Sequence, residues 1–277
     1  MTNIAFYSRF ILLAAVVSVA SVGCSQQAPR TPATYAASAK KAYDAANVEF
    51  EAHNWAESQA LFREVKRKYS YSRFAQLAEL RIADANFEQG KFADALREYK
   101  QFVHDHRADE KNVLYARSRM AEAQCNEIID SVLMPAGEER DQAPVLDAYK
   151  ELRGFLHDYP DVEESKHVRE LLSGVVGRLV RHELYVARFY LARAKFDATV
   201  SRINFALRNY IDDSVDRREA DSATLEPEAL LLLGETYLKM HRNDDATAAF
   251  NRLIERHPSS GQSVQAKNYI ALIPRGS

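Results

Sequence analysis

The sequence predicts an all-α protein in which pairs of antiparallel helices stack into a solenoid. The chain of 277 residues contains only nine Gly and eight Pro. Strand-rich folds need these residues in their many turns, so the shortage favours long helices joined by short loops. A pattern of small and large apolar residues also recurs five times between residues 46 and 258. Such an internal repeat is the signature of stacked, self-similar units.

The composition excludes several classes of protein. The chain carries 37 basic and 39 acidic side chains, whereas a duplex-binding protein usually has a clear basic excess, so nucleic acid is not an expected partner. A hydrophobic content of 47% is too high for a disordered chain. Only two cysteines occur, Cys24 and Cys125, so no disulfide framework is expected to stabilise the fold.

Residues 1–23 have the features of a lipoprotein signal peptide. A single charge, Arg9, precedes the apolar run 10–20, which is 11 residues long, about half the length that spans a bilayer as a helix. The sequence Ser21-Val22-Gly23-Cys24 follows and resembles a bacterial lipobox, with Ser21 where Leu is usual. Acylation of Cys24, with palmitate among the acyl groups, would anchor the chain to a membrane. The alternative is an ordinary secretory signal in which this cysteine is incidental.

Residues 24–34 are expected to form the lipidated N-terminus and a tether. Residues 25–32 are polar and include Pro29 and Pro32, a composition typical of an extended linker. By resemblance to bacterial lipoproteins, Ser25 rather than Asp after the cysteine implies the periplasmic face of the outer membrane.

The repeat consists of a small residue, a larger apolar or aromatic residue four positions later, and a helix stop twelve positions after the first. The sets are Ser58/Phe62/Ser70, Ala95/Tyr99/Arg107, Ala148/Leu152/Pro160, Thr199/Ile203/Ile211 and Ala246/Phe250/Pro258. Twelve positions before four of these markers stand further small residues, namely Ala46, Ala83, Ala187 and Gly234. Two helices approach closely only where small residues face each other, and the residue one turn later fills the adjacent gap.

This frame matches the tetratricopeptide repeat and predicts a right-handed solenoid of about five helix pairs. A generic helical bundle is the alternative. Repeats 1–2 are expected in residues 35–110 with a substrate-binding groove, repeat 3 with an inserted loop in 111–168, repeats 4–5 in 169–272, and a tail in 273–277. Insertions near 129–144 and 212–226 are long enough to be binding elements or disordered segments.

The first helix of each repeat is expected to line the concave face of the solenoid. The positions that point into this face are Tyr43, Asn47 and Phe50 in the first repeat and Leu80, Asp84 and Phe87 in the second. They predict an apolar groove for an extended peptide that bears aromatic side chains. The alternative is that the aromatic residues pack between helices. In the fourth repeat the lining is more basic, with Arg181, Leu184 and Arg188, and Trp55 is expected to cap the apolar layer.

Two segments resemble signatures of the BamD family, the lipoproteins of the β-barrel assembly machine. Lys68-Tyr69-Ser70-Tyr71-Ser72-Arg73-Phe74-Ala75 is similar to the family's Tyr-Pro-x-Ser-x-Tyr-Ala segment, with Ser70 replacing Pro and Phe74 replacing Tyr. Glu183-Leu184-Tyr185-Val186-Ala187-Arg188-Phe189-Tyr190 is similar to its Tyr-x-x-Ala-x-Tyr-Tyr helix, with Phe189 replacing one Tyr. The resemblance covers residues 35–270, almost the whole mature chain.

The resemblance implies a scaffold at the periplasmic face of a Gram-negative outer membrane. Its first repeats would receive the carboxy-terminal targeting signals of unfolded outer-membrane proteins. Its later repeats, including Arg181, Leu184 and Arg188, would dock on a periplasmic domain of the barrel-forming subunit BamA, beside other assembly lipoproteins. The competing interpretation is a periplasmic repeat adaptor that coordinates cell-wall synthesis with division. Such proteins often begin with a coiled-coil segment, which this sequence does not show.

The sequence does not predict an enzyme. His104 and His106 lack the Cys or carboxylate partners that would complete a metal site. Cys125 lies in helical register with Ala121 and is expected to be a buried apolar residue. No Gly-rich phosphate loop or nucleophile elbow occurs, and the repeats leave no room for the lysozyme-like domain of a lytic transglycosylase. No catalytic residue, metal or cofactor is therefore expected.

Overall fold

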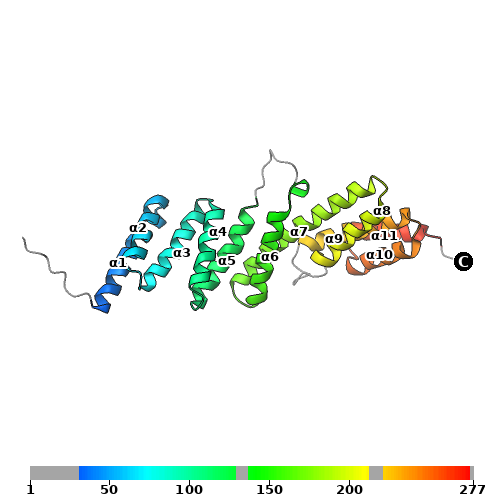
Figure 1. Ribbon diagram of the computed structural model, residues 1–277. Coiled ribbons are helices and arrows are strands. Elements are labelled where there is room, and N and C mark those ends of the chain that lie inside the picture. The colour runs from blue at the N-terminus through cyan, green and yellow to red at the C-terminus, as the bar shows by residue number, and fades with distance from the viewer. Residues whose placement is uncertain (1–30, 129–136, 212–220, 275–277) are drawn as a thin grey trace, which may run out of the picture.

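The computed structural model describes residues 31–128, 137–211 and 221–274, and these form an elongated row of helices (Figure 1). The row begins with α1 at one end and finishes with α11 at the other. The elements are α1 Pro32–Glu51, α2 Trp55–Lys68, α3 Arg73–Glu88, α4 Phe92–Asp105, α5 Glu110–Asn126, the 3-10 turn η1 Gly137–Glu139, α6 Ala143–Asp158, α7 Glu164–Leu191, α8 Phe196–Ala206, the π-helical turn η2 Leu207–Ile211, α9 Asp221–Lys239, α10 Asn243–Arg256 and α11 Gly261–Leu272. Five consecutive pairs, α1/α2 to α9/α10, precede α11, which confirms the predicted all-α repeat fold.

The marker residues of the repeat lie where the two helices of each pair meet. Ten of them have no exposed surface: Ser58, Phe62, Ala95, Tyr99, Ala148, Leu152, Thr199, Ile203, Ala246 and Phe250. The small residues of the first helices, Ala46, Ala83 and Ala187, are equally covered. The close contact between paired helices therefore forms at the positions that the sequence pattern indicates.

The same turn joins the two helices in four of the pairs. His53, Gly90, Ala194 and His241 have positive φ angles of 61°, 72°, 57° and 58°. The N–H group of the next residue donates to the carbonyl group five residues earlier, as in Asn54 N to Glu49 O at 2.9 Å. The N–H group of the left-handed residue donates to the carbonyl group three residues earlier, as in His53 N to Phe50 O at 3.0 Å. This Schellman arrangement closes the first helix, and the second helix begins two residues after the left-handed residue.

The start of α1 differs from the predicted tether. Pro32 is the first residue of α1 and not part of an extended linker. The Thr31 side chain accepts a hydrogen bond from Thr34 N at 3.2 Å and caps the helix. Proline suits this first position because its fixed φ is helical and it has no N–H group to satisfy.

Two boundaries further along the chain also differ from prediction. The helix α7 begins at Glu164, before the expected division between residues 168 and 169, so the fourth repeat starts earlier than predicted. The second predicted insertion ends early because α9 begins at Asp221 and includes Pro227. Buried Glu226 accepts bonds from Arg252 at 3.2 Å and His257 at 2.9 Å, which tie this end of α9 to α10 and the residue that follows it. Residues 129–136 and 212–220 of the two insertions lie outside the described residues.

The apolar core is divided along the row. One cluster joins α1, α2 and α3, a second joins α3, α4 and α5, and a third extends from α5 to α11. Trp55 packs edge-on against Phe50 with ring centroids 5.1 Å apart and closes the first cluster, as expected for a cap. Each repeat thus depends on its neighbours for its buried surface. None of the described helices is both long enough and apolar enough to cross a membrane.

We expect Gly234→Ala to destabilise the protein by about 2 kcal/mol. A Cβ atom at this position would overlap the ring of Phe250, which is completely buried and stacks on the ring of Tyr269. Thermal or urea unfolding of the purified protein measures the effect. Gly174→Ala in α7 is the matched control, since no atom lies near its Cβ position, and it should stabilise the helix by roughly 0.5–1 kcal/mol. Equal effects of the two substitutions would contradict the close contact.

We expect Ala194→Gly to stabilise the protein by about 1 kcal/mol, because a left-handed backbone conformation is unfavourable for alanine. The φ angle of Ala194 is 57°. Ala192→Gly is the control: Ala192 has a right-handed φ of −61° at the end of α7, so glycine offers no relief there and should not stabilise. Urea unfolding curves of the two variants would decide the matter, and a lower midpoint for Ala194→Gly would refute the role of this turn.

Candidate peptide-binding and docking surfaces

The first helices of repeats 1 to 3 share a face, which we call the first-helix face: the side of α1, α3 and α5 on which Tyr43, Phe50, Arg81, Tyr115 and Arg119 lie. Arg81 joins α1 to α3. Its Nε donates to the Tyr43 hydroxyl at 3.3 Å, and its guanidinium carbon lies 5.4 Å from the ring centroid of Phe50. The accessible part of this face at its N-terminal end therefore combines aromatic rings with a cation.

Asp84 lies at the centre of a buried polar network below this face. Its Oδ1 accepts hydrogen bonds from the Tyr99 hydroxyl at 2.5 Å and from the Tyr115 hydroxyl at 2.9 Å. Its Oδ2 accepts from Arg81 at 3.0 Å. Burial raises the pKa of the Asp84 carboxyl above its usual range, although the bonds from the two tyrosines and Arg81 oppose this shift. These contacts join α3 to both α4 and α5.

Arg119 completes the face on α5. Its guanidinium carbon lies 3.7 Å from the ring centroid of Phe87, and its nitrogens pair with Glu88 at 3.0 Å and Glu122 at 2.8 Å. Burial lowers the pKa of Arg119, but neighbouring Tyr99 and Glu122 more than offset this, and the guanidinium stays charged. A cation held in place over an aromatic ring is suited to binding a carboxylate or an aromatic side chain.

The structure places the six residues of the predicted groove at different depths. Tyr43 and Phe50 are half-buried on α1, and Asn47 beside them donates to Glu51 at 2.6 Å. Leu80, Asp84 and Phe87 are at most 8% exposed. The first three are accessible to a ligand, whereas the last three form the floor of the face.

Arg81, Tyr115 and Arg119 belong to this face, yet the sequence pattern did not single them out. The one sequence signal for such a role was an arginine in each of α3 and α5, the first helices of repeats 2 and 3. A charge at such a position also suits a solvated helix surface, so the contacts with Phe50 and Phe87 were needed to recognise the role.

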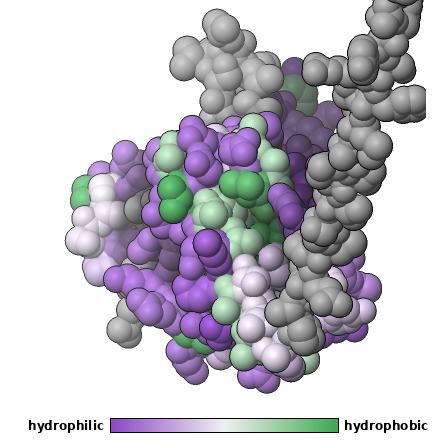
Figure 2. Space-filling view, turned by 90° about the vertical axis from the view of Figure 1, so that its left-hand side faces the viewer, coloured by the Kyte–Doolittle hydropathy of each residue, from purple (hydrophilic) through white to green (hydrophobic). Residues whose placement is uncertain are grey.

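At the N-terminal end of the molecule the surface is mostly hydrophilic around a narrow apolar strip (Figure 2). The exposed side chain of Val48 on α1 belongs to this end. An apolar strip with polar borders fits an extended segment better than a flat partner surface.

The fourth repeat carries a second candidate surface. Arg181 and Arg188 are exposed on α7, with Arg188 paired to Glu228 and Arg181 near Glu138, whereas Leu184 is buried and packs inside the core. Tyr185 and Phe189, one turn apart on α7, are 41% and 45% exposed, and Phe205 on α8 is 41% exposed. Aromatic residues with neighbouring arginines are the groups that dominate protein interfaces.

The histidines considered as metal ligands have other partners. His104 pairs with Asp105 at 2.8 Å and His106 with Glu79 at 2.8 Å. In the parts of the chain that the structure describes, no three His, Cys, Asp or Glu residues come together as a metal site. Burial raises the pKa of the Cys125 thiol to about 12, so it is protonated at neutral pH.

The chain is similar to known proteins in its sequence. Residues 35–241 match the YfiO family, described as an outer membrane lipoprotein, and residues 228–260 match a tetratricopeptide repeat. The outer membrane protein assembly factor BamD of Caulobacter vibrioides is 26% identical over 238 residues, which are 85% of this chain and 72% of that protein. The BamD protein of Xylella fastidiosa is 22% identical over 236 residues, 84% of this chain and 77% of that one. Among solved structures, a thermophilic TPR protein of Thermus thermophilus aligns over 85% of this chain and 100% of its own, with 16% identity and a TM-score of 0.36.

We expect Tyr99→Phe to lower the free energy of unfolding by about 1–3 kcal/mol, because buried Asp84 loses a hydrogen-bond donor. The bond stabilises the charged carboxylate, so the difference from wild type should shrink as the pH falls and Asp84 becomes protonated. Unfolding curves at several pH values measure this. Tyr71→Phe, on a fully exposed ring, is the control and should have no effect. A pH-independent difference would argue against the Asp84 network.

Proposed function

The chain belongs to the YfiO family of outer membrane lipoproteins, and we propose that it is a non-catalytic scaffold for the assembly of outer membrane proteins. The observation that carries the proposal is the family match over residues 35–241, most of the described solenoid. The named relatives are outer membrane protein assembly factors. A solenoid with an accessible aromatic face and a separate aromatic patch supports a role in binding two partners at once.

The membrane anchor in this proposal is the acylated Cys24. The cysteine follows a short apolar run in Ser21-Val22-Gly23-Cys24 and lies outside the described residues. The folded part begins at Pro32, so only a few residues separate the anchor from α1. The solenoid would then be held close to the periplasmic face of the outer membrane.

The substrate in this proposal is the carboxy-terminal segment of an unfolded outer membrane protein. Tyr43, Asn47 and Phe50 are accessible on α1, and Arg81 lies over the Phe50 ring. Aromatic side chains of the segment would pack on these rings, and its terminal carboxylate would pair with Arg81 or Arg119. Leu80, Asp84 and Phe87 would hold the floor of the site in shape.

The docking surface in this proposal lies on repeats 4 and 5. Tyr185 and Phe189 are exposed one turn apart on α7, and the Arg193 guanidinium carbon lies 3.5 Å from the Phe189 ring centroid. Arg181 and Arg188 flank the two rings, whereas Leu184 supports them from the core. A periplasmic domain of the barrel-forming subunit, with other assembly lipoproteins beside it, would bind here.

We predict that Asn47→Glu weakens peptide binding about tenfold. The probe is a fluorescent ten-residue peptide copied from the carboxy terminus of an outer membrane β-barrel protein, and fluorescence anisotropy measures its Kd. The added carboxylate would repel the terminal carboxylate of the peptide. Ala60→Glu is the matched control, since it adds the same charge at an exposed position on α2, away from the first-helix face. Equal binding by the two variants would remove this face from the substrate site.

We predict that Cys24→Ala releases the protein from membranes into the soluble periplasm, because the only proposed site of acylation is lost. Fractionation of cells that express each form, followed by immunoblotting, checks this. Cys125→Ala should leave the protein in the membrane fraction. Retention of the Cys24→Ala form at the membrane would reject the lipoprotein anchor.

A further inference from the structure

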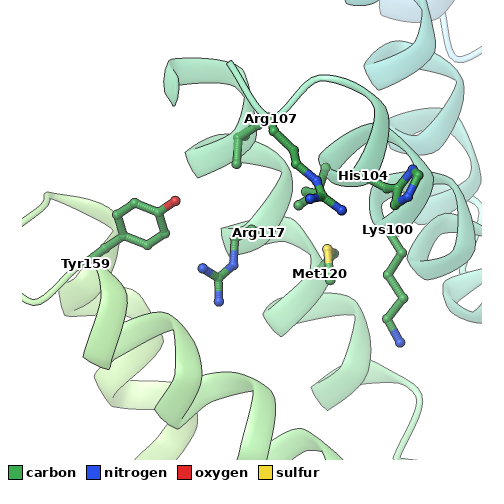
Figure 3. A pocket seen from close by; sticks show the side chains of 8 residues that line it. Lys100, His104, Arg107, Arg117, Met120 and Tyr159 are labelled. Atoms are coloured by element: carbon green, nitrogen blue, oxygen red, sulfur yellow. The ribbon is translucent and has the colours of Figure 1, made fainter. Parts of the chain in front are cut away.

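A groove on the opposite side of α5 from the first-helix face has a distinct chemistry. We call it the second-helix groove. It lies beside α4 and α5, has a volume of about 430 Å³, and is lined by Lys100, Val103, His104, Arg107, Val113, Arg117, Met120 and Tyr159. Figure 3 shows Lys100 and His104 on one side, Arg117 and Tyr159 on the other, and Met120 between them.

The two sides of α5 are separated by helix geometry. Arg117 lines the groove, whereas Arg119 lies over Phe87 on the first-helix face. Residues two positions apart in an α-helix, such as Arg117 and Arg119, are about 200° apart around the helix axis. A ligand in the second-helix groove would therefore not compete directly for the first-helix face.

The groove has an apolar floor and a basic wall. Val113 and Met120 are buried side chains that form the floor. The lining contains Lys100, Arg107 and Arg117 together with His104, and it contains no carboxylate. Neither Lys100 nor Arg107 makes an ion pair with a residue that the structure describes. Lys100 and Arg107 thus offer positive charge without a paired carboxylate next to apolar surface, whereas Arg117 and His104 pair with Asp158 and Asp105.

The equivalent groove one repeat earlier is neutralised. It lies beside α2, α3 and α4, has a volume of about 290 Å³, and is lined by Arg63, Lys66, Glu79, Ile82, Glu98, Gln101 and Phe102. Glu79 pairs there with Lys66 at 3.1 Å and with His106 at 2.8 Å. Glu79 and Arg117 occupy equivalent positions in the two grooves, because each lies three residues before an apolar lining residue, Ile82 or Met120. One repeat therefore has a carboxylate where the next has a guanidinium.

Helix ends do not account for this charge. Cations are favoured in the last turn of a helix, which explains His104 at the end of α4. Lys100 precedes that turn, and Arg117 lies in the middle of α5. Arg117 also keeps its place through Asp158, at 2.5 Å, and the ring of Tyr159, whose centroid lies 5.3 Å from its guanidinium carbon. A held arginine retains donors for a second carboxylate.

We propose that the second-helix groove binds an acidic segment of a partner protein, with carboxylates on Lys100, Arg107 and Arg117 and an apolar side chain on the floor. The charge complementarity of the groove, set against the neutralised groove beside it, supports this occupant. The rim carries the exposed carboxylates of Asp105 and Asp158. An anionic bilayer would press against these carboxylates, whereas a single peptide strand would pass between them.

The test is fluorescence anisotropy with the full chain and a labelled peptide that has two Glu residues on each side of a Leu-Phe pair. A peptide with Gln in place of every Glu is the matched probe. The Glu peptide should bind, and the Gln peptide should bind at least about tenfold more weakly. Binding of the Glu peptide should also weaken with added salt.

Lys100→Glu combined with Arg107→Glu should weaken binding of the Glu peptide at least about tenfold. Both side chains are exposed, so the melting temperature should not change. Lys41→Glu combined with Lys267→Glu makes the same change in net charge at exposed positions on α1 and α11 and should bind as wild type does. Equal loss in both double variants would show only a general charge effect and would overturn the proposal. Displacement by short-chain, monomeric phosphatidylglycerol, with no preference for the Glu peptide, would instead assign the groove to a lipid.

Discussion

The contact between the two helices of each repeat, made where small residues lie against a larger neighbour, determines the rest of the structure. Phe250 fills the space left by Gly234 so closely that even a methyl group does not fit. With the pairs in contact at this point, and four of them closed by a left-handed turn residue such as Gly90, the pairs stack in a row. That stacking creates one face from the first helices and grooves between the second helices.

Much of this could be predicted from sequence because the contact leaves a periodic trace. A small residue, an aromatic or aliphatic residue four positions later, and a stop recur at the five pairs, and the small and large residues of each set are buried. The length of α7 could not be predicted from the markers, since the only marker in this helix, Ala187, lies near its end and does not indicate where the helix begins. The helical start at Pro32 was missed because proline suits both a linker and the first turn of a helix.

The candidate sites were less predictable because they depend on contacts between repeats. The spacing placed Tyr43, Phe50 and Phe87 on one face, but whether each is accessible depends on its neighbours in space. Arg119 covers Phe87, while Phe50 remains partly open. The basic character of the second-helix groove is visible only when Arg117 is compared with Glu79 in the preceding repeat. A single helix, α5, thus separates two surfaces of different chemistry, as a scaffold for more than one partner requires.

The most direct test of the proposed role is affinity purification of the protein from gently solubilised outer membranes, with mass spectrometry of every protein that co-purifies. A form carrying Tyr185→Ser and Phe189→Ser on the exposed aromatic patch serves as the matched comparison. The proposal predicts recovery of a large barrel protein with repeated periplasmic domains by the wild type, and its loss in the variant. Recovery of cell-wall synthases or division proteins without that barrel protein would contradict the assembly role and favour the adaptor interpretation.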